Sequence, residues 1–313
     1  MHMVKNGRVD HIDIGKETEV DCSYCTGLVE LPNWPHVKYV NCSYCINLIR
    51  LPNWPCVTKV DCSFDLKLRT LPNWPVVEIV VLRDCIGLTT LPNWPCVNKV
   101  YLERCTALVE LPNWLCVKEV DLSDCSKLTY LPNWPVVEIV ILRDCTGLAT
   151  LPNWPVVTEV RMSRCTSLVE LPNWNKVTII SCSYCSSLTY LPNWMLVEIV
   201  YCEKCVNLIE LANWPCVVDV NCNGCIGLLT LPDWPSVTNV RCSDCTGLVE
   251  LPCWKKIVSI KCSRCINLYI IPKWTRSVGI DSEQCPKINH LEFITLMQTD
   301  FLQPNLVTEF IRL

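Results

Sequence analysis

The sequence predicts a mainly β repeat solenoid: one elongated right-handed superhelix with a parallel sheet along its concave side. All 13 tryptophans of the 313-residue chain recur at intervals of 20 residues without an insertion, from Trp34 to Trp274. The residues around each tryptophan repeat as well, as the segment from Leu51 to Val60 illustrates. A fixed period of this length indicates that each unit is one turn, which can bury its apolar face only against the neighbouring turns.

The strand of each turn is predicted from alternation. Val40 and Cys42 are expected to point inward, while Asn41 and Ser43 point outward. Pro52 and Pro55 exclude a long helix on the return path, because each lacks a backbone donor and favours extended geometry in the residue before it. The convex side is therefore expected to be extended or polyproline-like.

Three segments are expected along the chain. Residues 1–19 are predicted to form an N-terminal cap built as a hairpin strand. Residues 20–285 hold about 13 turns of 20 residues. Residues 286–313 lose the period and are predicted to form a helical C-terminal cap, with Asn289 as a helix cap. A partner-binding helix or a swapped segment is the alternative for this last part.

The charge and the apolar runs of the sequence exclude several classes of function. The net charge is −4 with acidic and basic residues interspersed, unlike the basic surface of a nucleic-acid-binding protein. No apolar run has transmembrane length, and the first 20 residues lack the apolar segment of a signal peptide. We therefore expect a cytoplasmic protein with no nucleic-acid or membrane partner. In that reducing compartment the 26 cysteines are expected to be thiols, not disulfides.

The repeat resembles the leucine-rich repeat family in its cysteine-containing form. The resemblance rests on Val37-x-x-Val40-x-Cys42-x-x-Cys45-x-x-Leu48 and covers roughly residues 20–285. The continuation, Leu51-Pro52-x-Trp54-Pro55, is similar to the short Leu-Pro-rich repeats of bacterial effector proteins, and similar arrays occur in large DNA viruses. The resemblance implies protein binding on the concave sheet, in the host cytoplasm if the chain is viral or an effector.

The repeated Cys-x-x-Cys spacing supplies half of a structural zinc site. Its first position, however, also holds Leu82, Leu102 and Met162, so cysteine there is expected to be a small buried hydrophobe. The tryptophans are likewise expected to form a stacked column in the core. We expect no metal, no disulfide and no cofactor.

Catalytic motifs are missing from the sequence. The chain has four histidines, and it contains neither a Gly-rich phosphate loop nor a zinc-protease motif. We therefore expect no enzyme.

Candidate binding residues come from the outward positions of the predicted sheet. One column of the repeat, which runs through Tyr44, Asp84 and Arg104, is expected on this sheet with neighbours about 5 Å apart. Exposed aromatic and apolar residues on such a face are typical of binding interfaces. The candidates are Tyr24, Tyr39, Tyr44, Phe64, Val81, Tyr101, Ile141 and Tyr201.

The sequence thus predicts an intracellular protein-binding or scaffold module, a monomer or weak homo-oligomer that binds an unidentified protein. The alternative is a structural component that associates with itself, for example in a particle. A thiol or metal function is a third possibility.

Overall fold

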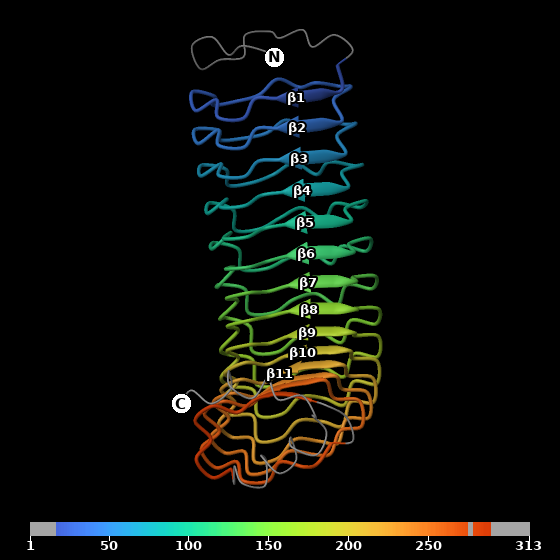
Figure 1. The fold of residues 1–313 in the computed structure, drawn as a ribbon. Coiled ribbons are helices and arrows are strands. Elements are labelled where there is room, and N and C mark those ends of the chain that lie inside the picture. Colours follow the sequence, from blue (N-terminus) through green and yellow to red (C-terminus); the bar gives the residue numbers. More distant parts are fainter. Residues whose placement is uncertain (1–16, 275–277, 289–313) are drawn as a thin grey trace, which may run out of the picture.

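The chain forms one stack of short turns, each contributing one strand to a single sheet (Figure 1). The computed structural model describes residues 17–274 and 278–288. The 14 strands have three residues each and are hydrogen-bonded in chain order. Their bounds are Glu19–Asp21 (β1), Tyr39–Asn41 (β2), Lys59–Asp61 (β3), Ile79–Val81 (β4), Lys99–Tyr101 (β5), Glu119–Asp121 (β6), Ile139–Ile141 (β7), Glu159–Arg161 (β8), Ile179–Ser181 (β9), Ile199–Tyr201 (β10), Asp219–Asn221 (β11), Asn239–Arg241 (β12), Ser259–Lys261 (β13) and Gly279–Asp281 (β14).

Every strand pair is parallel, and the register repeats with the sequence period. Val40 of β2 pairs with Val60 of β3, which pairs with Val80 of β4. None of the described residues forms a helix. The predicted parallel solenoid of about 13 turns is therefore confirmed. The expected hairpin of the N-terminal cap and the expected helices of the C-terminal cap fall almost wholly in residues 1–16 and 289–313, which lie outside the described part.

The middle residue of each strand points into the stack, as the alternation predicts. Val40 and Cys42 are fully buried, whereas Asn41 and Ser43 are partly exposed. The same burial pattern recurs turn after turn, so one continuous core of valine, leucine, cysteine and tryptophan runs along the axis. Because a turn buries these groups only against the next turn, the stack depends on its nearest-neighbour interfaces.

The tryptophans form the predicted buried column inside the stack, each in the segment that leads into a strand. Eleven consecutive indoles, Trp54 to Trp254, are at most 1% exposed. Successive ring centroids lie between 5.8 Å (Trp214 and Trp234) and 6.2 Å (Trp174 and Trp194) apart. From Trp54 to Trp254 each Nε1–H donates to a main-chain carbonyl 22 residues earlier, such as Trp134 to Pro112 at 3.0 Å. Each of these eleven indoles is therefore both packed and hydrogen-bonded between turns.

The spacing of the indoles accounts for the direction in which the stack curves. Parallel strands lie about 4.8 Å apart, which is less than the separation of successive indoles. The sheet side of each turn is therefore thinner than the tryptophan side. In Figure 1 the last turns bend so that the sheet lies on the inner side of the curve.

Each strand ends in a turn whose second residue has a left-handed backbone conformation. This residue is Tyr44 after β2, with φ 62°, and it is Asp124 after β6, also with φ 62°. Glycine fills this position once in the stack, at Gly224. The column that was expected on the sheet therefore lies in the turn beside it, which corrects that part of the sequence analysis. Its members are Tyr24, Tyr44, Phe64, Asp84, Arg104, Asp124, Asp144, Arg164, Tyr184, Lys204, Gly224, Asp244, Arg264 and Gln284.

A β-branched residue in this column is expected to destabilise the stack. Asp124→Val should lower the free energy of unfolding by about 1–2 kcal/mol, because a branched Cβ clashes with the backbone at positive φ. Asp124→Gly should not lower it. Urea unfolding measures both, with Lys127→Val as the control, since Lys127 lies in the same turn without a positive φ. An equal loss in Asp124→Val and Lys127→Val would contradict the strain argument.

Candidate partner-binding surface on the sheet

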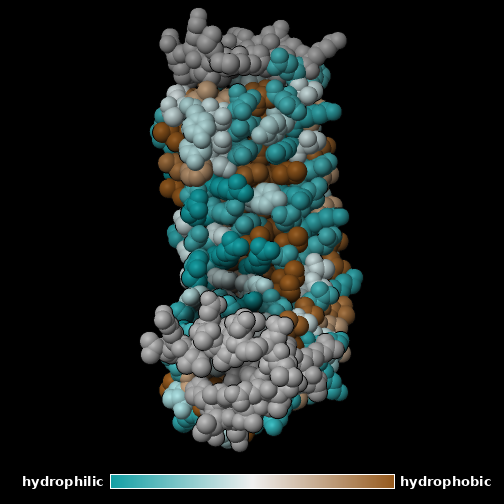
Figure 2. Space-filling model, viewed as in Figure 1, coloured by the Kyte–Doolittle hydropathy of each residue, from teal (hydrophilic) through white to brown (hydrophobic). Residues whose placement is uncertain are grey.

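The first and third residues of each strand point away from the core and form the outer face of the sheet. Charged and polar residues hold most of these positions. Apolar and aromatic residues gather on β4, β5, β7, β9 and β10, and Figure 2 shows hydrophobic patches among hydrophilic residues on this side of the stack. We call this group the apolar band; its members are Ile79, Val81, Tyr101, Ile139, Ile141, Ile179, Ile199 and Tyr201.

The structure divides the predicted site residues between two places. Tyr39, Tyr101, Ile141 and Tyr201 lie on the outer face and are half-buried, whereas Val81 on the same face is only 8% exposed. The remaining three, Tyr24, Tyr44 and Phe64, lie in the neighbouring turn column.

Sequence reasoning missed half of the apolar band. Ile79, Ile139, Ile179 and Ile199 occupy the first position of their strands, directly before the inward residue. The signal was present in the sequence, because Tyr39 had been placed outward at the same position of the repeat. Reading that column across the turns would have found them.

Tyr101 is held in place by charged neighbours. Its hydroxyl donates to Glu119 Oε1 at 2.9 Å, and the guanidinium of Arg83 lies 5.7 Å from its ring centroid. Lys99 Nζ donates to Glu119 Oε2 at 2.8 Å, and Arg83 Nε to Glu103 Oε1 at 2.7 Å. The ring is therefore fixed on the surface before any partner arrives.

Tyr201 has a similar arrangement five strands away. Its hydroxyl donates to Asp219 Oδ2 at 3.3 Å, and the guanidinium of Arg241 lies 5.5 Å from its ring. Arg241 also bonds to Asp219 at 2.8 Å. With strands about 4.8 Å apart, the two tyrosines lie about 24 Å from each other along the stack.

Partial burial favours the protonated state of two tyrosines on the outer face, Tyr39 and Tyr101. Partial burial, followed by the hydrogen bond to Glu119, raises the pKa of Tyr101. Partial burial and the carboxylates of Asp61 and Asp21 raise the pKa of Tyr39. Both phenols therefore stay neutral hydrogen-bonding groups at physiological pH, which suits binding and not nucleophilic chemistry.

The side chains of the turn column contact mainly one another. Tyr24 stacks on Tyr44 at 4.6 Å between centroids, and Tyr44 stacks on Phe64 at 4.2 Å. Further along, Arg104 and Asp84 form a two-pronged ion pair. Equivalent pairs join Arg164 to Asp144 and Arg264 to Asp244, and Lys204 lies over Tyr184. These contacts stabilise neighbouring turns, and they leave Tyr24 as the exposed end of the aromatic stack, at 68% exposure.

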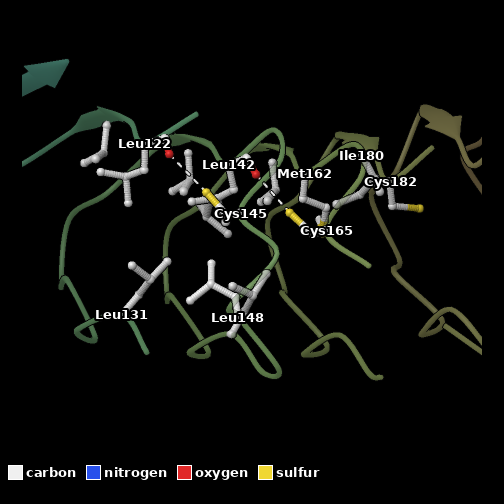
Figure 3. Packing of buried hydrophobic residues seen from close by; sticks show 14 of the residues in the cluster. Leu122, Leu131, Leu142, Cys145, Leu148, Met162, Cys165, Ile180 and Cys182 are labelled. Atoms are coloured by element: carbon white, nitrogen blue, oxygen red, sulfur yellow. Dashed lines mark hydrogen bonds between the residues drawn. The ribbon is translucent and has the colours of Figure 1, made fainter. Parts of the chain in front are cut away.

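The cysteines are free thiols that belong to the core. All 26 are unpaired, and 20 are buried. From Cys45 to Cys285, the cysteine that follows the left-handed residue donates its S–H to a main-chain carbonyl 23 residues earlier in every turn except that of Asp65. Figure 3 shows this for Cys145 to Leu122 at 3.0 Å and Cys165 to Leu142 at 2.9 Å. Burial raises the pKa of several of these thiols, among them Cys85 and Cys105, and at Cys105 the pKa reaches about 12.

Alkylation should separate the thiols into classes. In the folded protein iodoacetamide is expected to react quickly at the five exposed cysteines, Cys56, Cys96, Cys116, Cys216 and Cys253. Half-buried Cys25 should react more slowly, and the 20 buried thiols only after unfolding, because the reagent cannot reach a sulfur atom inside the core. Mass spectrometry with and without urea counts the adducts. Rapid labelling of Cys145 in folded protein would contradict the buried ladder.

The described residues offer few features that would bind or convert a small molecule. The one histidine there, His36, is exposed. A surface hollow of about 250 Å³ is lined by Thr90, Leu91, Glu110, Leu111 and Pro112, away from the apolar band. It is smaller than most ligand pockets. No helix in the described part is long and apolar enough to cross a membrane.

In the comparisons with known proteins, the matches are to solved structures. No protein-family profile and no curated protein match the chain. Among solved structures, a leucine-rich repeat protein from Bacteroides ovatus is 16% identical over 86% of this chain and 80% of its own, with TM-score 0.45. A leucine-rich cell surface protein from Faecalibacterium prausnitzii is 15% identical over 84% and 89%, with TM-score 0.38. The pneumococcal vaccine antigen PcpA is 10% identical over 82% and 83%, with TM-score 0.23.

At these TM-scores the architecture rests on the chain's own geometry. The finer resemblance to effector and viral repeats stays a prediction. The 20-residue period, the in-register parallel strands and the leucine and cysteine positions of the core agree with one another. The chain is a parallel β-solenoid with the repeat layout of leucine-rich-repeat proteins.

Proposed function

We propose that this chain is a protein-binding module that holds a partner protein across the outer face of its sheet, between β4 and β10. The observation that carries the proposal is the pair of fixed tyrosines, Tyr101 and Tyr201, set among half-buried isoleucines. Aromatic anchors that are already ordered lose little conformational entropy on binding and dominate interface energies. The ion pairs around them supply a polar rim.

The partner we propose is an extended or gently convex protein surface with two apolar contact points. The band spans six strand spacings, or about 29 Å. Acidic and basic residues are mixed around it, so the surface does not select a highly charged polymer such as nucleic acid. We further propose a reducing, cytoplasmic setting, which the 26 free thiols support.

Site-specific crosslinking tests the proposal. A photoreactive residue at position 141, in the band, should crosslink one partner protein in cells, and the same residue at position 130 should not. Tyr130 is exposed but lies outside the sheet strands. The double variant Tyr101→Ala and Tyr201→Ala should reduce the crosslink at least tenfold, whereas Tyr130→Ala should leave it unchanged. Equal crosslinking from both positions would refute the assignment.

Self-association is the second candidate, and a different surface favours it. An exposed column of apolar side chains runs along the segment that follows each buried leucine; it includes Val29, Ile49, Val109, Val169, Ile209 and Leu229. Side-to-side packing of two stacks would cover this column. Mass photometry of purified protein would show a defined oligomer in that case, and Ile209→Lys with Leu229→Lys would dissociate it. A monomer at micromolar concentration would exclude it.

A further inference from the structure

One position interrupts the thiol ladder in the core. Where the other turns place a cysteine, the third complete turn has Asp65, which is 0% exposed. Neither of its carboxyl oxygens has a hydrogen-bond partner. The equivalent thiols from Cys45 to Cys285 all donate to a carbonyl 23 residues earlier, as Cys85 does to Cys62 at 3.0 Å. Asp65 forms no such bond, so the ladder does not explain the aspartate.

Two thiols lie directly beside this carboxyl group. Cys42 and Cys62 follow the adjacent strands β2 and β3, and their sulfur atoms are 3.6 Å apart. One carboxyl oxygen and the two sulfurs all lie within 4.8 Å of one another, and all three residues are fully buried. Among the described residues, this is the one group of three potential ligands so close together.

The spacing of the two sulfur atoms fits a tetrahedral metal ion. Two thiolates bound at about 2.3 Å to a tetrahedral zinc ion are about 3.8 Å apart, close to the separation of Cys42 and Cys62. Thiolates select zinc over magnesium or calcium, which prefer oxygen ligands. A buried carboxylate is tolerated when it coordinates a metal.

We propose that Cys42, Cys62 and Asp65 bind a zinc ion inside the solenoid. Binding displaces the protons of the two thiols and of the carboxyl group, and three negative ligands then surround a divalent cation. Because the site is enclosed, the ion enters while these turns fold or open locally. The expectation of no metal considered pairs within one turn, whereas this group joins residues of two adjacent turns.

The repeat offers a matched control within the same chain. Cys182, Cys202 and Cys205 occupy the equivalent positions seven turns on, with a thiol in place of the carboxyl group. Their ligand atoms do not form such a group. Leucine fills the position of Cys62 and Cys202 in four other turns, Leu82, Leu102, Leu122 and Leu142, so replacement by leucine should preserve folding.

The test uses the full chain, refolded under reducing conditions with excess zinc and then dialysed. Native mass spectrometry should find one zinc ion in the wild type and in Cys202→Leu, and none in Cys62→Leu. Asp65→Asn should hold zinc at least tenfold more weakly. Refolding with cobalt should give thiolate charge-transfer absorption in the wild type and in Cys202→Leu but not in Cys62→Leu.

Three results would overturn the proposal: a metal-free wild type, zinc retained by Cys62→Leu, or zinc lost equally from Cys202→Leu. Retention by Cys62→Leu would place the ion on other thiols, such as the five exposed ones. Circular dichroism of each variant establishes that the fold is intact, so a loss of zinc in folded Cys62→Leu is a loss of ligands.

Discussion

In buffer with a chelator at pH 7, Asp65→Cys is expected to raise the free energy of unfolding by on the order of 4 kcal/mol. Burial is the main cause that raises the pKa of Asp65, from 3.8 to about 9. The folded chain must therefore protonate this group at pH 7, where the unfolded chain holds it ionised. About three pH units lie between pH 7 and the unfolded value, at 1.36 kcal/mol each. Cysteine removes this cost and restores the thiol donor toward the carbonyl of Cys42.

The same substitution should change how stability depends on pH. Below about pH 4 the carboxyl group is protonated in both states, so its titration costs nothing. The cost grows as pH rises from about 4 to about 9, because the unfolded state loses the proton first. Asp65→Asn should remove this dependence as well, since its amide can donate but does not titrate.

Urea unfolding at pH 5 and pH 8 measures both effects. The reverse change, Cys125→Asp, serves as the control, because Cys125 is fully buried at the equivalent position and bonds to the carbonyl of Leu102. It should destabilise the chain, and more at pH 8 than at pH 5. A stability difference between wild type and Asp65→Asn that is independent of pH would contradict this account.

Trp134→Ala is expected to cost about 3–5 kcal/mol, the usual loss for a large aromatic residue in a core. The Trp134 indole is fully buried and stacks on Trp114 at 6.0 Å and on Trp154 at 6.1 Å. Its removal also takes away the donor to Pro112. Since turns contact only their neighbours, the loss falls on two adjacent interfaces.

The form of the unfolding curve distinguishes this effect from uniform destabilisation. In Trp134→Ala the turns before and after the substitution should unfold separately, so the dependence of the free energy on urea should weaken. Trp134→Phe keeps most of the packing and should cost less. Circular dichroism follows both transitions. A single transition of unchanged steepness would contradict the nearest-neighbour description.

The sequence was sufficient for the architecture because each apolar position is repeated many times. Val40 and its equivalents could point only inward, and the two prolines beside Trp54 exclude a helix. The turn after each strand was less predictable. Tyr44, Asp84 and Arg104 gave no signal of positive φ, since glycine, the usual residue there, appears once, at Gly224. Hydrogen bonds such as that from Tyr44 N to Ser63 O, at 2.7 Å, hold this conformation.

The surface was predicted in part for a related reason. Tyr101, Ile141 and Tyr201 could be placed on the outer face from alternation alone. Their fixed positions depend on Arg83, Glu119 and Arg241, whose contacts cross strands and appear only in three dimensions. Asp65 was visible as a break in the repeat, but its distance to two sulfurs of adjacent turns was not.

Because the register is uninterrupted, the number of turns between two surface residues sets the distance between them. Because every turn holds 20 residues and adds one strand spacing, the gap between Tyr101 and Tyr201 is a whole number of equal steps. Removing residues 121–140 would join two equivalent points of the repeat and shorten the gap by about 4.8 Å, while the turns on either side kept their shape. Gain or loss of single turns therefore changes the distance between the two tyrosines in equal steps. A longer or shorter partner can then be recognised without a change in any contact residue.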